Sequence, residues 1–130
     1  MKNVMMAGDD PMLIDMDTLG QGNPVFDLAG LYVAYHLFKE DEPENSMNFL
    51  GITNEMVDQI LSAIIDRYFN DNDDSERQQL IERIALTASI RFLFLLMSTD
   101  LKNGKLGQTR IAHTREHIDE LLKTVTTLSI

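Results

Sequence analysis

The chain has 130 residues, of which 44% are hydrophobic, so it is long enough for one core but too short for two full domains. Its 21 acidic and 11 basic residues give a formal net charge of −10, which disfavours binding to nucleic acids and to anionic membrane surfaces. It contains no cysteine, no signal-peptide pattern and no apolar run long enough to span a bilayer, so we expect a soluble, cytoplasmic protein.

The N-terminal segment is predicted to form a β-hairpin. Residues 3–6 and 12–16 have the pattern of short strands, the second of them buried, and residues 7–11 supply a Gly- and Asp-containing turn. The hairpin would carry Asn3 at one end and Asp15 at the other. Carboxylate and amide oxygens are the ligands that Mg²⁺ prefers in proteins. These two side chains are therefore a candidate magnesium site.

Three motifs follow one another in a fixed order within the first 29 residues. They are Asn3, then Leu13-Ile14-Asp15-Met16-Asp17, then Gly22-Asn23-Pro24-Val25-Phe26-Asp27-Leu28-Ala29. This order resembles the aminoglycoside phosphotransferase and choline kinase-like family, which has a protein-kinase-like fold. The signature of that family is H-G-D-x-x-x-x-N, a hairpin, I-D-x-x and then G-x-P-x-x-D-L-A. An ordered, multi-part motif of this kind is far more specific than any one of its pieces.

The resemblance implies a role for each matching residue. Asn3 and Asp15 would bind magnesium and, through it, the phosphates of ATP. Asp17 is a weaker candidate for a second metal contact. Asp27 would be a buried acceptor that braces the catalytic loop from the first turn of the following helix. In the complete enzyme, MgATP would donate its γ-phosphoryl group to a hydroxyl of a small molecule.

Several parts of the family's machinery are missing from this chain. The catalytic Asp of the signature would fall before Met1, and the nucleotide-binding N-terminal lobe is also absent. We therefore expect a C-terminal-lobe fragment that carries metal ligands without the general base and is inactive alone. Helices that once packed on the absent portion should leave apolar surface uncovered. Such surface favours a homo-oligomer or a separate polypeptide that supplies the missing N-terminal half.

Apolar residues recur at helical spacing in the rest of the chain. We predict four helices, over residues 27–38, 54–69, 76–99 and 109–125. Thr53 is expected to cap the second, and residues 40–44 form an acidic loop after the first. The third is apolar on most faces from residue 86 to 97, so it should be the central helix of the core.

The predicted fold class is mainly α (α+β). A single domain would consist of a metal-binding hairpin and loop over residues 1–25, packed on a helical C-lobe over residues 26–130, with about four helices. The second helix is expected to bury Met56, Ile60, Ile64 and either Tyr68 or Phe69. The last is expected to bury Ile111, Ile118, Leu121, Leu122 and Val125.

An acidic segment before the third helix has oxygen donors at calcium-loop spacing. The donors are Asp71, Asp73, Ser75 and Glu82. Glu76 stands where a calcium loop requires glycine. Ser75 and Gln78 have the spacing of a capping box, which is the preferred interpretation.

Two histidines four residues apart on the last helix have a spacing that is able to bind Zn²⁺. No third ligand is identifiable for His113 and His117. A solvated helix face, with pairing to Glu116 or Glu120, is therefore preferred over a zinc site.

The main alternative to a kinase fragment is a protein of a different class. It is a stand-alone helical interaction or dimerisation module that retains a kinase-derived hairpin without metal chemistry. An acidic calcium-binding protein is a third possibility. Ligand-induced stabilisation separates the first two, because Mg²⁺-nucleotide raises the melting temperature only if the site still binds it.

Overall fold

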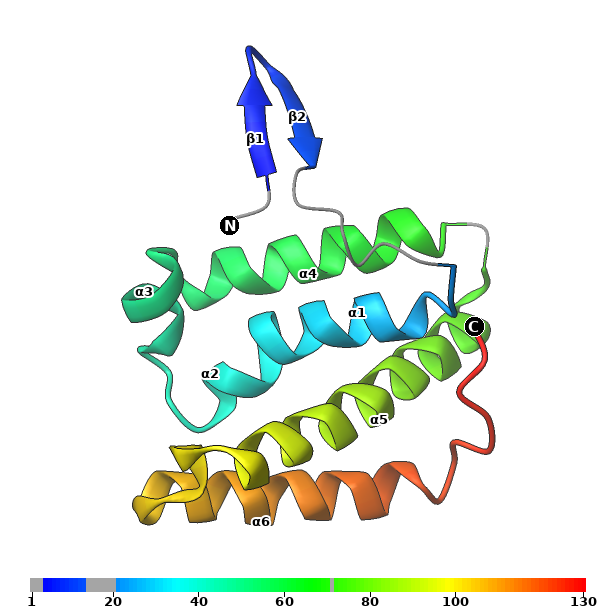
Figure 1. Ribbon diagram of the computed structural model, residues 1–130. Helices are drawn as coiled ribbons and strands as arrows, with labels where there is room; N and C mark the ends of the chain where they lie inside the picture. The colour runs from blue at the N-terminus through cyan, green and yellow to red at the C-terminus, as the bar shows by residue number, and fades with distance from the viewer. Residues whose placement is uncertain (1–3, 14–20, 71) are drawn as a thin grey trace.

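Two short strands begin the described chain, which covers residues 4–13, 21–70 and 72–130 of a computed structural model (Figure 1). β1 (Val4–Ala7) pairs antiparallel with β2 (Asp10–Leu13), with Val4 opposite Leu13. Gly8 turns the chain at φ 69°, a left-handed conformation that glycine adopts without strain. The predicted hairpin is therefore confirmed over residues 4–13.

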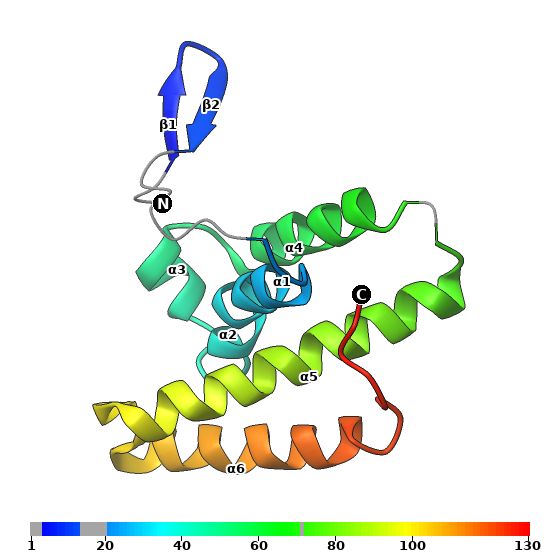
Figure 2. The same ribbon diagram turned by 45° about the vertical axis from the view of Figure 1, so that its right-hand side comes forward.

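The hairpin stands apart from the helices in both views (Figures 1 and 2). Residues 5–12 are all exposed, including Met5 and Met12. The expectations of a buried second strand and of a hairpin packed on helices are wrong for these residues, because no described helix covers either face of the two-stranded ribbon. A lone two-stranded hairpin is only marginally stable in water.

The remainder is helical, so the predicted fold class, mainly α with a short hairpin, is confirmed. The elements are α1 (Val25–Tyr32), a π-helical turn η1 (Val33–Leu37), α2 (Phe38–Glu40), α3 (Asn45–Leu50), α4 (Asn54–Tyr68), α5 (Asp74–Ser98), a 3₁₀ turn η2 (Asp100–Lys102) and α6 (Gly104–Leu121). Figure 1 shows α1 between α4 and α5, and α5 between α1 and α6. Within the described residues, no helix combines the length and apolar character needed to cross a membrane.

The first predicted helix is continuous but not uniform. It begins at Val25, directly after Pro24, and the Asn23 side chain accepts a hydrogen bond from the Val25 amide at 3.0 Å. It continues through η1 and α2 to Glu40. A π-helical turn accommodates an extra residue and changes the angular positions of the side chains that follow. The sequence pattern predicted one regular helix and missed this turn.

α5 is the central helix of the core, as predicted, but only along part of its circumference. Two buried clusters pack on it. The first is Val25, Leu28, Tyr35, Val57, Leu61, Ile65, Phe69 and Ile84, and the second is Ala29, Leu37, Ala88, Phe92 and Leu96. Phe38 meets the Phe92 ring edge-on at 4.8 Å between centroids. In contrast, Ile90, Phe94 and Met97 are exposed, so the expectation that residues 86–97 are surrounded by protein is wrong on that side.

The cap of α4 is confirmed, and its predicted inward face is displaced by one residue. The Thr53 hydroxyl accepts a hydrogen bond from the Met56 amide at 3.3 Å. The buried side chains are Val57, Leu61 and Ile65, whereas Met56 is exposed and Ile60 and Ile64 are half-buried. Of the two candidates at the end of the helix, Phe69 is buried, as predicted for one of them, and Tyr68 is exposed. Two adjacent apolar stripes run along this helix, about 100° apart. Packing against the first helix selects one of them, and the sequence pattern alone does not.

The start of α5 also differs from the prediction. Asp73 is the N-cap, and its carboxylate accepts a hydrogen bond from the Glu76 amide at 2.9 Å. The predicted capping box of Ser75 and Gln78 is therefore wrong, because the helix begins two residues earlier. The short α3 was not predicted, since its six residues are too few to show a period.

α6 begins at Gly104, earlier than the predicted residue 109. Gly107 lies inside the helix because α6 packs directly on the preceding turn, and a side chain there would collide with the Leu101 carbonyl oxygen. The buried α6 residues are Gly107, Arg110 and Thr114 rather than the predicted apolar set, and Leu122 is exposed. On its packed side, α6 thus buries a glycine, an arginine and a threonine instead of the apolar seam that the pattern predicted.

Candidate functional site

The predicted magnesium ligands Asn3, Asp15 and Asp17 lie outside the described residues. In the described hairpin, the first and last residues, Val4 and Leu13, lie opposite each other at one end. Residues 4–13, 21–70 and 72–130 contain no group of three or more His, Asp or Glu side chains that could hold a metal ion.

Asp27 lies in the first turn of α1, as the family pattern implies. Its side chain is exposed, however, and no described residue donates a hydrogen bond to it. The expectation of a buried acceptor is wrong here, because α1 turns Val25, Leu28 and Ala29 toward the core and Asp27 away from it. A carboxylate in a first helical turn also interacts favourably with the helix dipole.

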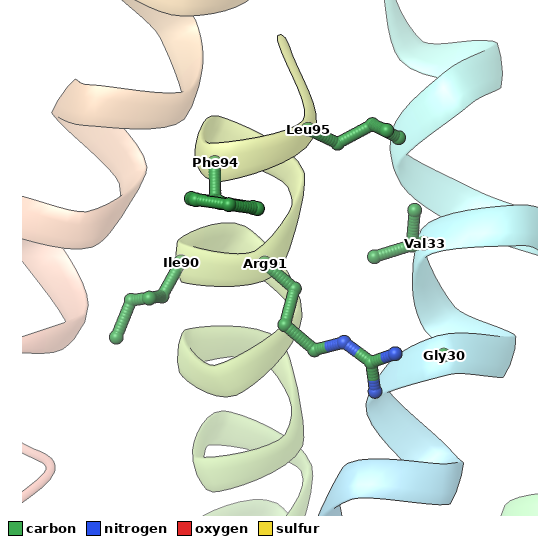
Figure 3. Close-up of a pocket in the computed structure, with 6 residues that line it drawn as sticks. All are labelled: Gly30, Val33, Ile90, Arg91, Phe94 and Leu95. Carbon is green, nitrogen blue, oxygen red and sulfur yellow. The ribbon is translucent and has the colours of Figure 1, made fainter. Parts of the chain in front are cut away.

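A groove of about 540 Å³ lies between α1 and α5. Its lining is Gly30 and Val33 from the first helix, and Ile90, Arg91, Phe94 and Leu95 from α5 (Figure 3). The Phe94 side chain is 74% exposed, which is unusual for a phenylalanine on a central helix. The Arg91 guanidinium reaches across the groove to the Phe26 carbonyl oxygen.

A second cavity, of about 470 Å³, lies between α2, α3 and α6 and has Arg110 in its wall. Arg110 is only 5% exposed. Its guanidinium lies 5.4 Å from the Phe38 ring centroid and donates hydrogen bonds to the Phe38 carbonyl at 3.0 Å and to the Glu42 carboxylate at 3.1 Å. Its Nε is buried and has no hydrogen-bond partner among the described atoms. Arg110 therefore connects α6 to the end of the first helix.

Sequence reasoning missed Arg110. A lone arginine on a helix usually indicates a solvated face. The available signal was spacing, since Arg110 lies three residues after Gly107 and four before Thr114, on the side that packs on the rest of the protein. The Thr114 hydroxyl donates to the Arg110 carbonyl at 2.7 Å, as is common for threonine one helical turn later.

Histidines and carboxylates alternate where α2 meets α6. His36 Nε2 lies 3.2 Å from a Glu40 oxygen, and His113 Nδ1 lies 2.6 Å from an Asp41 oxygen. The His36 hydrogen bond lowers the pKa of Glu40 below its usual range, although burial opposes this effect, and the charges of His36, His117 and His113 lower it further. The three histidines therefore stabilise the ionised form of Glu40.

The described residues provide no third ligand for a zinc site at His113 and His117. His113 pairs with Asp41, not with the predicted Glu116 or Glu120. His117 instead lies 3.4 Å from the Ser89 hydroxyl, which is fully buried and therefore inaccessible to a substrate. The calcium interpretation is also weakened, because Asp73 is engaged as a helix cap and Asp71 lies outside the described residues.

Tyr32 packs against His36, with 4.6 Å between the ring centroids. Burial, together with the nearby Glu40 carboxylate, raises the pKa of Tyr32 to about 12. The phenol therefore stays protonated at neutral pH and cannot serve as a base. The ion pairs of this region, His36 with Glu40 and His113 with Asp41, therefore serve to hold the helices in place.

Comparison of the chain with protein-family models, with curated proteins and with solved structures found no match.

Proposed function

We propose that the chain is the C-terminal part of an ATP-dependent small-molecule phosphotransferase. The observation that carries this proposal is the ordered motif of Asn3, Asp15 and Asp27 on a chain that forms a hairpin followed by a helix. A hairpin is what the family pattern requires between the asparagine and the aspartate. A helix with an aspartate in its first turn is what the pattern requires next.

The hairpin register supports the pairing of the two magnesium ligands. Asn3 directly precedes Val4, Asp15 follows Leu13 by two residues, and Val4 and Leu13 are cross-strand partners. Consecutive Cα atoms are about 3.8 Å apart, so we propose that both oxygen donors act together at the end of the hairpin where Val4 and Leu13 pair. Asp17 lies two residues further along the same segment.

In the complete enzyme, Mg²⁺ would neutralise charge on the transferring phosphoryl group. The part of Asn3 and Asp15 is to hold that ion beside the nucleotide, with Asp17 as a further contact. These 130 residues do not include the family's general base or its nucleotide-binding lobe, so we propose that they hold MgATP through the metal alone and carry out the transfer only together with such a lobe. The absence of cysteine fits a reducing compartment such as the cytoplasm.

Thermal unfolding in the presence of MgATP tests this proposal. We expect MgATP to raise the melting temperature and ATP without Mg²⁺ to leave it unchanged, because ligand that binds only the folded state stabilises it, by roughly 2.7 kcal/mol at a hundredfold excess over Kd. Asp15→Asn should abolish the shift, and Asp9→Asn, a matched change in the exposed hairpin turn, should retain it.

Two results would contradict the proposal. No shift at millimolar MgATP would mean that the hairpin does not bind magnesium nucleotide. Sustained ATP hydrolysis that Asp15→Ala abolishes would show that the chain does not need a separate lobe.

The second candidate function is a stand-alone helical interaction module. The exposed apolar groove between α1 and α5 favours it, since large apolar patches on a surface usually mark a binding site. Binding of a protein partner that is unaffected by Asp15→Asn, together with no response to MgATP, is the result expected for this function.

A further inference from the structure

An apolar stripe runs along the exposed side of α5. Ile90, Phe94 and Met97 are spaced by four and three residues, so they lie on one side of the helix over about two turns. Their exposed fractions are 47%, 74% and 49%. Ile90 and Phe94 also line the groove against α1 (Figure 3). The stripe and the groove form one continuous apolar surface, which we call the α5 face.

Three cations border the α5 face. Arg91 lines the groove beside Phe94. Arg115 of α6 approaches Met97, with Nη2 3.9 Å from the sulfur, and Lys102 donates to the Met97 carbonyl at 3.1 Å. None of the three lies within ion-pair distance of a carboxylate in the part of the chain that the structure describes. The α5 face is therefore apolar with a positive rim on a protein of net charge −10.

Four other cations of the described chain are paired with carboxylates. Lys39 pairs with Asp58, Arg77 with Asp66, Arg110 with Glu42, and Lys123 with Glu120. The acidic residue next to the rim, Asp100, is contacted by Asn103, whose amide is 3.4 Å away. The charges at the rim thus remain available to a partner.

We propose that the α5 face binds an amphipathic helix with acidic flanks from another polypeptide. A helix fits because a stripe with helical spacing presents ridges and grooves that a second helix can match. Apolar side chains of the partner would enter the groove of about 540 Å³ beside Phe94. Its Asp and Glu residues would pair with Arg91, Lys102 and Arg115, which adds specificity and speeds association.

Charge argues against a second copy as the occupant. A second copy packed through the same face about a two-fold axis would place one positive rim against another. The inference does not depend on the proposed magnesium site, because the α5 face and the hairpin lie in separate parts of the fold (Figure 1).

Two synthetic helical peptides test the proposal. Both are fluorescein-labelled and carry Leu at the apolar positions, and one has Glu on both flanks whereas the other has Lys. By fluorescence anisotropy with the full chain at low salt, we expect the Glu peptide to bind at least about tenfold more tightly than the Lys peptide. The preference should shrink as added salt screens the rim.

Variants locate the binding surface. Phe94→Glu should abolish binding of the Glu peptide. Phe49→Glu is the matched control, because Phe49 is 85% exposed on α3 and outside the α5 face, and it should leave binding unchanged. The double variant Arg91→Glu, Arg115→Glu should reverse the preference in favour of the Lys peptide. Far-ultraviolet circular dichroism establishes that each variant is folded.

Four outcomes would overturn the proposal. The first is that neither peptide binds at about 100 μM, and the second is that both bind equally, as for a nonspecific apolar surface. The third is sedimentation equilibrium that shows a dimer of the wild type and a monomer of Phe94→Glu, which would assign the face to a second copy. The fourth is sedimentation with phosphatidylserine vesicles that Phe94→Glu abolishes, which would assign it to a membrane.

Discussion

The two sides of α5 have similar composition and different surroundings. One side carries Ala88, Phe92 and Leu96, which are buried against the first helix. The other carries Phe94 and Met97, which are exposed. Apolar composition therefore indicates that a helix requires cover on several sides, but it does not indicate that one chain provides all of it. The exposed side is also bordered by the positive charges of the rim.

Two phenylalanines two residues apart provide the strongest test of this difference. Phe92→Ala should lower the free energy of unfolding by about 3 to 5 kcal/mol, because it leaves a cavity in the core. Phe94→Ala should change it by less than about 0.5 kcal/mol, because the side chain is exposed. Urea unfolding followed by circular dichroism measures both. Equal losses would mean that the α5 face is covered within the isolated chain.

Two arginines of α6 extend the comparison from apolar residues to cations. Arg110→Ala should cost about 2 kcal/mol, because it removes charge-assisted hydrogen bonds and packing on Phe38 from a buried position. Arg115→Ala at the exposed rim should cost less than about 0.5 kcal/mol. Unfolding of the two variants in guanidinium chloride measures both free energies. A larger loss of stability in the Arg115 variant would contradict the assignment of Arg110 as the buried arginine of α6.

The start of α5 offers a smaller effect with a matched control. Asp73→Ala should cost about 1 kcal/mol, since it removes the oxygen that accepts from the Glu76 amide. Ser75→Ala should be nearly neutral, because Ser75 lies inside the helix rather than at its cap. Melting temperatures distinguish the two positions. A greater loss in the Ser75 variant would restore the capping box that the sequence predicted.

The smallest expected effect is a pH-dependent one at Glu40. Its pKa is lower in the folded state than its ordinary value of 4.5, so its contribution to stability is present above that value and is lost as the pH falls through the lowered pKa. Glu40→Gln should therefore be less stable than wild type at pH 7 and indistinguishable from it in strong acid. The difference should be below about 0.5 kcal/mol, because the side chain is half-exposed. A difference that grows on acidification would contradict this assignment.

Local signals were sufficient for the elements they govern directly. The Gly8 turn, the Thr53 cap and the long apolar period of α5 each depend on a few neighbouring residues, and each is confirmed. The inward face of α4 was displaced by one residue because two apolar stripes compete and only tertiary packing decides between them. The pattern starts the last helix at residue 109 and misses Gly107, because the sequence does not reveal that the backbone of Leu101 and Lys102 packs against this glycine.

The candidate site could be predicted only in part. The hairpin that flanks Asn3 and Asp15 is confirmed over residues 4–13, and the two ligands themselves remain a prediction. Asp27 was correctly placed in a first helical turn but not in a buried one. Arg110 was missed because a buried cation is recognised by its partners, Phe38 and Glu42, which lie about seventy residues away in the chain.

The π-helical turn η1 (Val33–Leu37) has a consequence for how this protein tolerates changes in length. Removing one residue from the turn would convert it to a regular α-helical turn, and the side chains after it would keep their present directions, because the π-helical turn holds one more residue than an α-helical turn. Asp41 would stay beside His113. The same deletion in α1 (Val25–Tyr32), where the helix is regular, would rotate every later side chain on it by about 100° and separate this pair. The position of a one-residue deletion within this helix therefore decides whether the α2–α6 contact survives it.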